Sequence, residues 1–199
     1  MARYEIDLVG GHPALDFLNT VHDWTEEPVR DGLASFGDAV RFGEAAGLLS
    51  RAEARQLGER ENRAELARLV ELRAVLQRVA SALLAGRAPL APDLDALAAC
   101  AVEVASGTRL RRAGAGLRRT VTTDHVGAGV LRLRIADAAL ALLTTGGAER
   151  VKSCPACGWF FVDTSKNRSR RWCSMSTCGA SAKSKRYYHK AKGSRPREE

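Results

Sequence analysis

The chain reads CPACGWFFVDTSKNRSRRWCSMSTC from Cys154 to Cys178, and this stretch decides the fold of its C-terminal part. Two cysteine pairs, Cys154 with Cys157 and Cys173 with Cys178, stand fifteen residues apart. Pairs at this spacing converge from a knuckle and a second turn to give four thiolates, the tetrahedral set of soft ligands that Zn²⁺ prefers. Gly158 allows the tight turn after the first pair. The sequence therefore predicts a four-cysteine zinc site.

The run of residues 180–192 contains neither Gly nor Pro and predicts a helix that opens beside the last cysteine. A knuckle, a hairpin and then a helix form a treble-clef-like arrangement, although the spacing also fits a zinc ribbon. This segment has few aliphatic side chains, so we expect metal binding and folding to be coupled.

Three other uses of these cysteines fit less well. Disulfides are disfavoured because the chain has five cysteines and because its N-terminus, MARYEIDLVG, predicts no signal peptide. A redox Cys-x-x-Cys motif would leave the second pair unexplained. A catalytic zinc site needs an open coordination position, which four cysteines close. We expect one structural Zn²⁺, held by Cys154, Cys157, Cys173 and Cys178.

The charge of the 199-residue chain, +8 in total, is unevenly distributed. Residues 1–149 contain 18 Arg, no Lys and 20 acids, a net charge of −2, whereas residues 150–199 contain 13 bases and three acids, a net charge of +10. This step lies beside a Gly146-Gly147 breaker. It predicts a domain over 1–149, a zinc finger over 150–193 and a disordered tail over 194–199.

Apolar residues of the larger domain recur mostly at helical spacing, and Ser, Asn and Pro mark the helix starts. We expect helices over 35–47, 50–61, 62–86, 92–106 and 124–144. The alternating stretch 108–122 predicts a β-hairpin, and the first segment, around Pro13, predicts short extended pieces joined by a tight turn. The expected fold class is mainly α with a small β component, plus the treble-clef-like finger. No apolar run is long enough to span a membrane.

Two features of this domain favour a structural interpretation. The hairpin carries Arg109, Arg111, Arg112, Arg118 and Arg119, for which alternation favours a solvated face over a phosphate-binding strip. Cys100, alone in an Ala-rich helix, is expected to be a small buried hydrophobic residue.

Basic side chains surround the expected zinc site and form a compact electropositive surface, which favours nucleic acid as a partner over a solvated basic face. The candidate DNA-binding residues are Lys166, Arg168, Arg170, Arg171, Lys183, Lys185, Arg186 and Lys190. Among them, Arg170 and Arg171 are candidates for bidentate contacts to bases, and the lysines for contacts to the backbone.

The segment from Arg150 to Arg186 resembles the CGNR zinc finger, in which a first cysteine pair and F-x-D-x-S, R-R-W-C-S-M and C-G-N-R-x-K segments recur. The N-terminal LVGGHPALDFLNT, residues 8–20, resembles the opening of the ABATE domain that usually precedes this finger. The chain departs from the pattern at residues 178–181, which read CGAS. The zinc ligands remain, but an Asn and an Arg suited to contacting DNA or capping the helix are absent.

The resemblance implies a bacterial, cytoplasmic and stress-linked transcription regulator whose finger binds DNA and whose N-terminal domain has a sensing or ligand-binding role. It names Gly11, His12, Asp16 and Asn19, with Gly10 and Thr20, as candidates for a ligand pocket. Turns and helix caps use these same residue types, so a structural role is the alternative for all of them.

The expected function is that of a transcription regulator with no enzymatic activity. The finger binds DNA, and the N-terminal domain either senses a small-molecule effector or mediates assembly, for example into a homodimer. The alternative is a zinc-thiolate redox sensor or a protein-interaction module without sequence-specific DNA binding.

Overall fold

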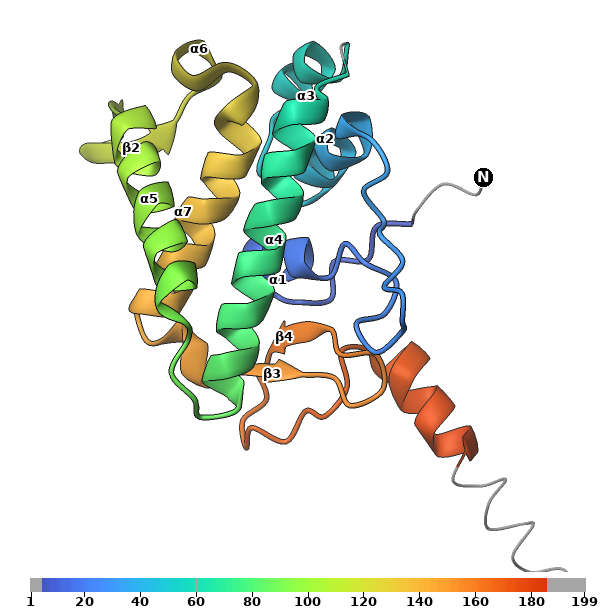
Figure 1. Ribbon diagram of the computed structural model, residues 1–199. Coiled ribbons are helices and arrows are strands. Elements are labelled where there is room, and N and C mark those ends of the chain that lie inside the picture. The colour runs from blue at the N-terminus through green and yellow to red at the C-terminus, as the bar shows by residue number, and fades with distance from the viewer. Residues whose placement is uncertain (1–4, 60, 186–199) are drawn as a thin grey trace, which may run out of the picture.

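A computed structural model describes residues 5–59 and 61–185 of the chain. Three long helices lie side by side and form the body of the molecule: α4 (Arg63–Leu84), α5 (Ala91–Gly107) and α7 (Val130–Thr144) (Figure 1). The short helix α1 (Pro13–Leu18) packs against α4 and α7. The largest fully buried apolar side chains of this body are Phe17, Phe36, Phe42, Leu69, Leu131 and Ile135.

Helices α2 (Phe36–Ala45) and α3 (Arg51–Gly58) begin where the capping-box spacing predicts. The side chains of Ser35 and Ser50 each accept a hydrogen bond from the backbone N–H three residues on. The carboxylate of the acid at that position accepts a hydrogen bond from the backbone N–H of the serine. Asn62 caps α4 in the same way by accepting from the N–H of Glu65, which confirms the predicted break.

The predicted β-hairpin is present as β1 (Thr108–Ala113) paired antiparallel with β2 (Gly116–Val121). The prediction that one helix begins at Asp124 is wrong. The chain first forms the four-residue α6 (Thr123–Val126) and the 3₁₀ turn η1 (Gly127–Gly129). Gly127 has a φ of 56°, a left-handed conformation that breaks the helix, so α7 starts only at Val130.

The prediction for the first segment is also wrong, because its centre is the helix α1 rather than an extended turn. Pro13 occupies the first helical turn, where its fixed φ suits the helix and its missing N–H leaves no bond unmade. The side chain of His12 caps the helix by accepting from the N–H of Ala14 over 3.3 Å. Burial of Phe17 and Leu18 against the body stabilises the short helix.

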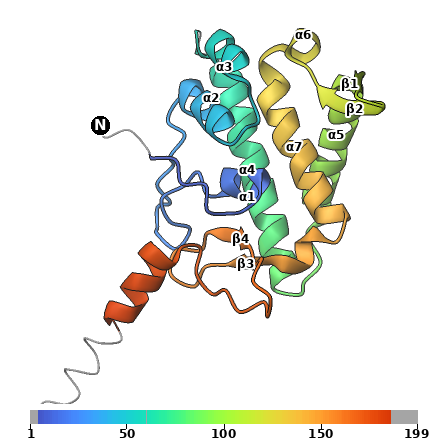
Figure 2. The same ribbon diagram turned by 180° about the vertical axis from the view of Figure 1, so that it is seen from behind.

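The finger follows α7 through the 3₁₀ turn η2 (Gly147–Arg150). Strands β3 (Val151–Ser153) and β4 (Phe160–Val162) pair antiparallel beneath the body, and the π turn η3 (Met175–Gly179) continues as a helix over 180–185 (Figures 1 and 2). This helix projects away from the rest of the molecule in both views. The mainly α fold with a small zinc finger is thus confirmed. Among the described residues, no helix combines the length and the apolar character needed to cross a membrane.

Candidate metal centre and its basic surface

The four predicted cysteine ligands converge on one point. Their sulfur atoms all lie within 4.8 Å of one another, and the Cys157–Cys173, Cys173–Cys178 and Cys178–Cys157 pairs are each 3.6 Å apart. A tetrahedron of Zn–S bonds of about 2.3 Å has sulfurs about 3.8 Å apart, whereas a disulfide needs about 2.05 Å. The spacing therefore fits one zinc ion and not a disulfide.

The electrostatics of the centre also call for a cation. Burial raises the pKa of Cys154, but backbone N–H groups, that of Cys173 foremost, donate to its sulfur and hold the pKa below its ordinary value. The pKa of Cys157 is raised, first by its bond with Cys173 and then by burial, and burial raises that of Cys178 to about 12. Cys157 and Cys178 therefore ionise together only around a positive charge, which Zn²⁺ supplies when bound.

The first cysteine pair lies in the turn between β3 and β4. The N–H of Cys154 donates to the carbonyl of Trp159 over 2.8 Å, and the N–H of Gly158 donates back to Cys154 over 2.8 Å. Gly158 has a φ of 72°, and a Cβ at this position would lie 2.7 Å from the Cβ of Trp24. Glycine is therefore required here, both for the turn and for the close approach of the N-terminal segment.

The second pair spans the π turn η3. Ser174 caps this turn by accepting from the N–H of Thr177 over 3.4 Å, and Cys178 lies at its end, where the helix 180–185 begins. Ala180 and Ser181, which replace the Asn and Arg of the C-G-N-R segment, are both exposed. Their change alters the surface of the finger and leaves the sulfur centre intact.

A buried carboxylate organises the loop between the two cysteine pairs. Asp163 is fully buried and accepts from the Lys152 ammonium at 2.6 Å, from the N–H and hydroxyl of Ser165 at 2.9 and 2.6 Å, and from the N–H of Arg170 at 3.0 Å. These bonds, that of Lys152 first, hold the pKa of Asp163 below its ordinary value. Sequence reasoning assigned no role to Asp163, although the F-x-D-x-S segment contained it.

Arg170 has a structural position that does not fit the expected base contact. Its guanidinium donates to the carbonyls of Val9, Val162 and Trp172 at 3.0, 3.3 and 3.0 Å, and also to that of Cys173. It lies 4.5 Å from the centre of the Phe161 ring. These four hydrogen bonds use four of its five N–H donors, and Arg170 thereby ties the N-terminal segment to the zinc loop.

The other predicted DNA-binding residues are exposed as far as the structure describes them. These exposed residues are Lys166, Arg168, Arg171, Lys183 and Lys185. The guanidinium of Arg171 lies 5.5 Å from the Trp172 ring, and that of Arg168 lies 3.9 Å from the carboxylate of Glu149. Arg186 and Lys190, together with the predicted tail 194–199, lie outside the described residues.

The finger is bonded directly to the start of the chain. The buried Asn19 side chain donates to the carbonyl of Phe160 over 2.9 Å and accepts from its N–H over 2.8 Å, so it pairs with β4 as a strand would. The N–H of Val162 donates to the carbonyl of Gly10 over 2.8 Å, and the indole of Trp159 donates to Val21 over 3.0 Å. The N-terminal segment is therefore a structural partner of the finger.

The residues named as a ligand pocket take part in these structural contacts. His12 caps α1, and its pKa is lowered by burial. Asp16 accepts from the N–H of Gly10 over 2.7 Å, and burial raises its pKa to about 6 against the smaller opposing effect of that bond. Gly11 has a φ of 70°, as a turn requires. The geometry favours the structural alternative for His12, Asp16 and Asn19.

A cleft does occur elsewhere, between α4 and α5. It has a volume of about 520 Å³, and Leu72, Leu97 and Arg132 are among its lining residues. Cys100 also lines it and is half-buried rather than buried, which corrects that expectation in part. Burial raises the pKa of its thiol, so this cysteine is a poor nucleophile.

Comparison with known families agrees with this geometry. The ABATE family, described as "putative stress-induced transcription regulator", matches residues 11–146, and the CGNR zinc finger matches residues 150–191. No curated protein matches the chain. The first match covers most of the chain, and the second contains all four cysteines of the metal centre. The chain therefore belongs to the ABATE family, and its C-terminal part is a CGNR zinc finger that binds a single zinc ion.

Proposed function

We propose that the protein regulates transcription by binding DNA through its finger, chiefly through phosphate contacts. The observation that carries the proposal is the one-sided charge of the described finger residues, 150–185. Their exposed residues include six bases, whereas their single acid, Asp163, is buried and paired with Lys152. Such a surface attracts the closely spaced phosphates of a duplex, and the exposed carboxylate of Glu149 at its edge lies beside Arg168.

The exposed bases differ in what they are suited to bind. Arg171 has a planar guanidinium beside the Trp172 ring and suits a bidentate contact to a base or a phosphate. Lys166, Lys183 and Lys185 suit single contacts to the backbone. The helix 180–185 starts at the metal centre and projects from the body, a position that supports the proposal that it enters a groove (Figure 1).

The N-terminal domain, in this proposal, holds the finger in one orientation and senses an effector or mediates assembly. Asn19 at the end of α1 forms hydrogen bonds with the backbone of β4, so a displacement of α1 would move the finger as well. The proposal includes a cytoplasmic location, where thiols stay reduced and available to zinc. It includes no enzymatic step.

The experiment is a titration of labelled genomic fragments with the zinc-loaded full chain, followed at several salt concentrations. Arg171→Gln combined with Lys183→Gln removes two charges from the finger and should weaken binding about tenfold, with a fall of about two in the salt slope. The matched control is Arg51→Gln with Arg55→Gln, which changes two exposed arginines on α3, far from the finger in the sequence. Absence of binding at low salt, or equal behaviour of the two variants, contradicts the proposal.

A second candidate function is redox sensing, and the half-buried Cys178 favours it because the other three ligands are buried. In this reaction peroxide takes two electrons and two protons to form water, two thiolates join as a disulfide, and zinc is released. Zinc release by mild peroxide, with recovery on reduction by a thiol, tests this candidate. Zinc retention under those conditions contradicts it.

A further inference from the structure

The β1–β2 hairpin is a second concentration of positive charge, separate from the finger. Residues 108–121 contain five arginines and no acid, although the 149-residue region around them is close to neutral. All five arginines are exposed. The hairpin is therefore the one strongly basic segment of the N-terminal region among the residues the structure describes.

The strand register places two of these arginines directly opposite each other. Arg111 pairs with Arg118 across the hairpin, and Arg109 lies on the same face one step toward its base. The opposite face carries Val121, which is buried in the body, and the exposed Leu110 and Leu117 further out. The Arg111–Arg118 face therefore turns away from the body and into solvent.

Intramolecular acids do not neutralise this face. Arg119, on the other face, forms an ion pair with Asp137, and Arg109 bends back to the carbonyl of Ser106 and the imidazole of His125. Within residues 5–59 and 61–185, the side chains of Arg111 and Arg118 form neither a hydrogen bond nor an ion pair, although their backbones belong to the β1–β2 ladder. Like charges directly opposite each other destabilise a hairpin, and here no acid offsets the repulsion.

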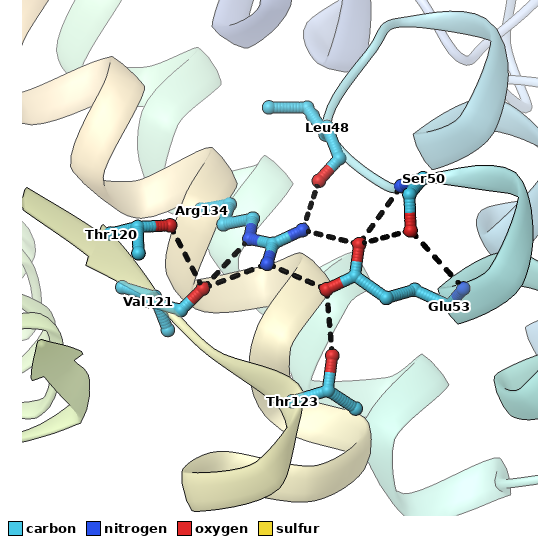
Figure 3. Close-up of polar contacts among 7 residues, drawn as sticks. All are labelled: Leu48, Ser50, Glu53, Thr120, Val121, Thr123 and Arg134. Atoms are coloured by element: carbon cyan, nitrogen blue, oxygen red, sulfur yellow. Dashed lines mark hydrogen bonds and ion pairs between the residues drawn. The ribbon is translucent and has the colours of Figure 1, made fainter. Parts of the chain in front are cut away.

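The base of the hairpin, in contrast, is firmly anchored. Arg134 on α7 donates twice to the carbonyl of Val121, over 3.0 and 2.8 Å, and once to that of Leu48, over 2.6 Å (Figure 3). The same guanidinium pairs with Glu53 at 2.7 and 3.0 Å, and Glu53 also accepts from the Thr123 hydroxyl at 2.8 Å. A ribbon fixed at its base loses little freedom when its outer face binds a partner.

The hairpin and the finger occupy opposite ends of the helical body in both views (Figures 1 and 2). The 15-residue helix α7, about 22 Å long at 1.5 Å a residue, leads from the end near the hairpin to the end near the finger. Contacts at the two ends are therefore independent, and their effects on binding should add.

We propose that the β1–β2 hairpin is a second DNA-binding element, in which Arg111 and Arg118 together grip the phosphate backbone of a duplex. A two-stranded ribbon fits the major groove, and two guanidinium groups side by side suit bidentate contacts to phosphate oxygens. The phosphates supply the negative charge that this face lacks. The inference does not depend on DNA binding by the finger, since it rests on a different surface.

The test uses the zinc-loaded full chain and a labelled duplex of about 30 base pairs, long enough to reach both ends. Arg111→Gln with Arg118→Gln should weaken binding about tenfold and lower the salt slope by about two, because two phosphate contacts are lost. The α3 control, Arg51→Gln with Arg55→Gln, removes the same charge and should change the affinity less than twofold. Thermal melting of each variant verifies that the fold is intact.

A second measurement separates the hairpin from the finger. In a full chain carrying Cys173→Ser, residual binding with a salt slope of about two should remain, and the hairpin substitutions should abolish it. Equal behaviour of the hairpin variant and the α3 control overturns the inference. If Arg171→Gln with Lys183→Gln has no effect while the hairpin variant weakens binding, the proposed role of the finger fails and that of the hairpin stands.

Discussion

The body and the finger of this molecule are stabilised by different means. The body buries a continuous set of aromatic and aliphatic side chains among α1, α4 and α7, with Phe17 and Ile135 fully buried. The buried centre of the finger consists of three cysteines and Phe161. Hydrocarbon burial therefore suffices for the larger region, whereas the smaller one depends on a metal and on a few polar contacts.

The two regions also use arginine differently. In the body, the buried Arg132 pairs with Glu65 at 2.8 Å, and Arg134 pairs with Glu53, so these two arginines are neutralised by acids within the protein. In the finger, Arg170 is held by hydrogen bonds to backbone carbonyls, but Arg171 is exposed. Charge alone thus does not identify a binding residue, and the acids and carbonyls within reach decide which arginines remain for a partner.

The largest expected effect comes from removing a zinc ligand. Cys173→Ser should lower the zinc content to well under one ion per chain and unfold the finger, while the helices of the body persist, because their core contains no zinc ligand. Metal analysis and far-ultraviolet circular dichroism measure the two outcomes separately. Binding to genomic fragments should fall by more than tenfold, to the level that the hairpin supports.

Cys100→Ser is the matched control, because Cys100 lies in α5 and faces the cleft between α4 and α5. This variant should retain one zinc ion and its affinity for DNA. Unchanged zinc content in Cys173→Ser would contradict the four-cysteine centre. Loss of the helical signal in that variant would show that the body depends on the finger.

A smaller effect is expected from the buried carboxylate of the finger. Asp163→Asn removes the charge that pairs with Lys152 and one of the acceptors that hold the loop at Ser165 and Arg170. Because Lys152 keeps contact with solvent, loss of this charge should lower the free energy of unfolding by about 2 kcal/mol, while zinc remains bound at one ion per chain. Chemical denaturation with metal analysis measures both quantities. The exposed Asp95→Asn on α5 is the control, and equal stability of the two variants would contradict the assigned role.

Local signals in the sequence predicted much of this structure. Capping residues fixed the starts of α2, α3 and α4, alternation fixed the hairpin, and cysteine spacing fixed the metal ligands. Each of these features depends on residues close together in the chain or on a strongly specific ligand set.

The features that the sequence did not predict depend on contacts between distant residues. The basic loop predicts a DNA contact for Arg170, but its guanidinium donates to the carbonyl of Val9, which lies 161 residues away in the sequence. Asn19 was assigned to a pocket, and its partner Phe160 lies 141 residues away. A helix as short as α1 also has weak periodicity, so only packing against the body reveals it.

The smallest expected effect concerns Asp16, the buried aspartate of α1. Its contribution to stability changes with pH in the direction opposite to that of Asp163 in the finger. The pKa of Asp16, about 6 in the folded protein, lies above the ordinary value of 3.8, so the folded state binds the proton more tightly. The stability from this group is present below pH 4 and is lost as the pH rises through 6. Asp163, with its pKa held low, stabilises above pH 4 and loses that contribution as the pH falls.

Asp16→Asn keeps an oxygen that accepts from Gly10 and removes the charge whose burial is unfavourable. We expect a gain of about 1 kcal/mol at pH 7, because the new amide N–H₂ lacks a good partner and offsets part of the benefit. At pH 4 the carboxyl of Asp16 is protonated in the folded state and stabilises the wild type, so the gain should turn into a loss, whereas the loss in Asp163→Asn should be greatest at pH 7. Chemical denaturation of both variants at the two pH values measures these slopes. A gain in Asp16→Asn that is equal at pH 4 and pH 7 would show that packing, rather than ionisation, determines the effect at α1.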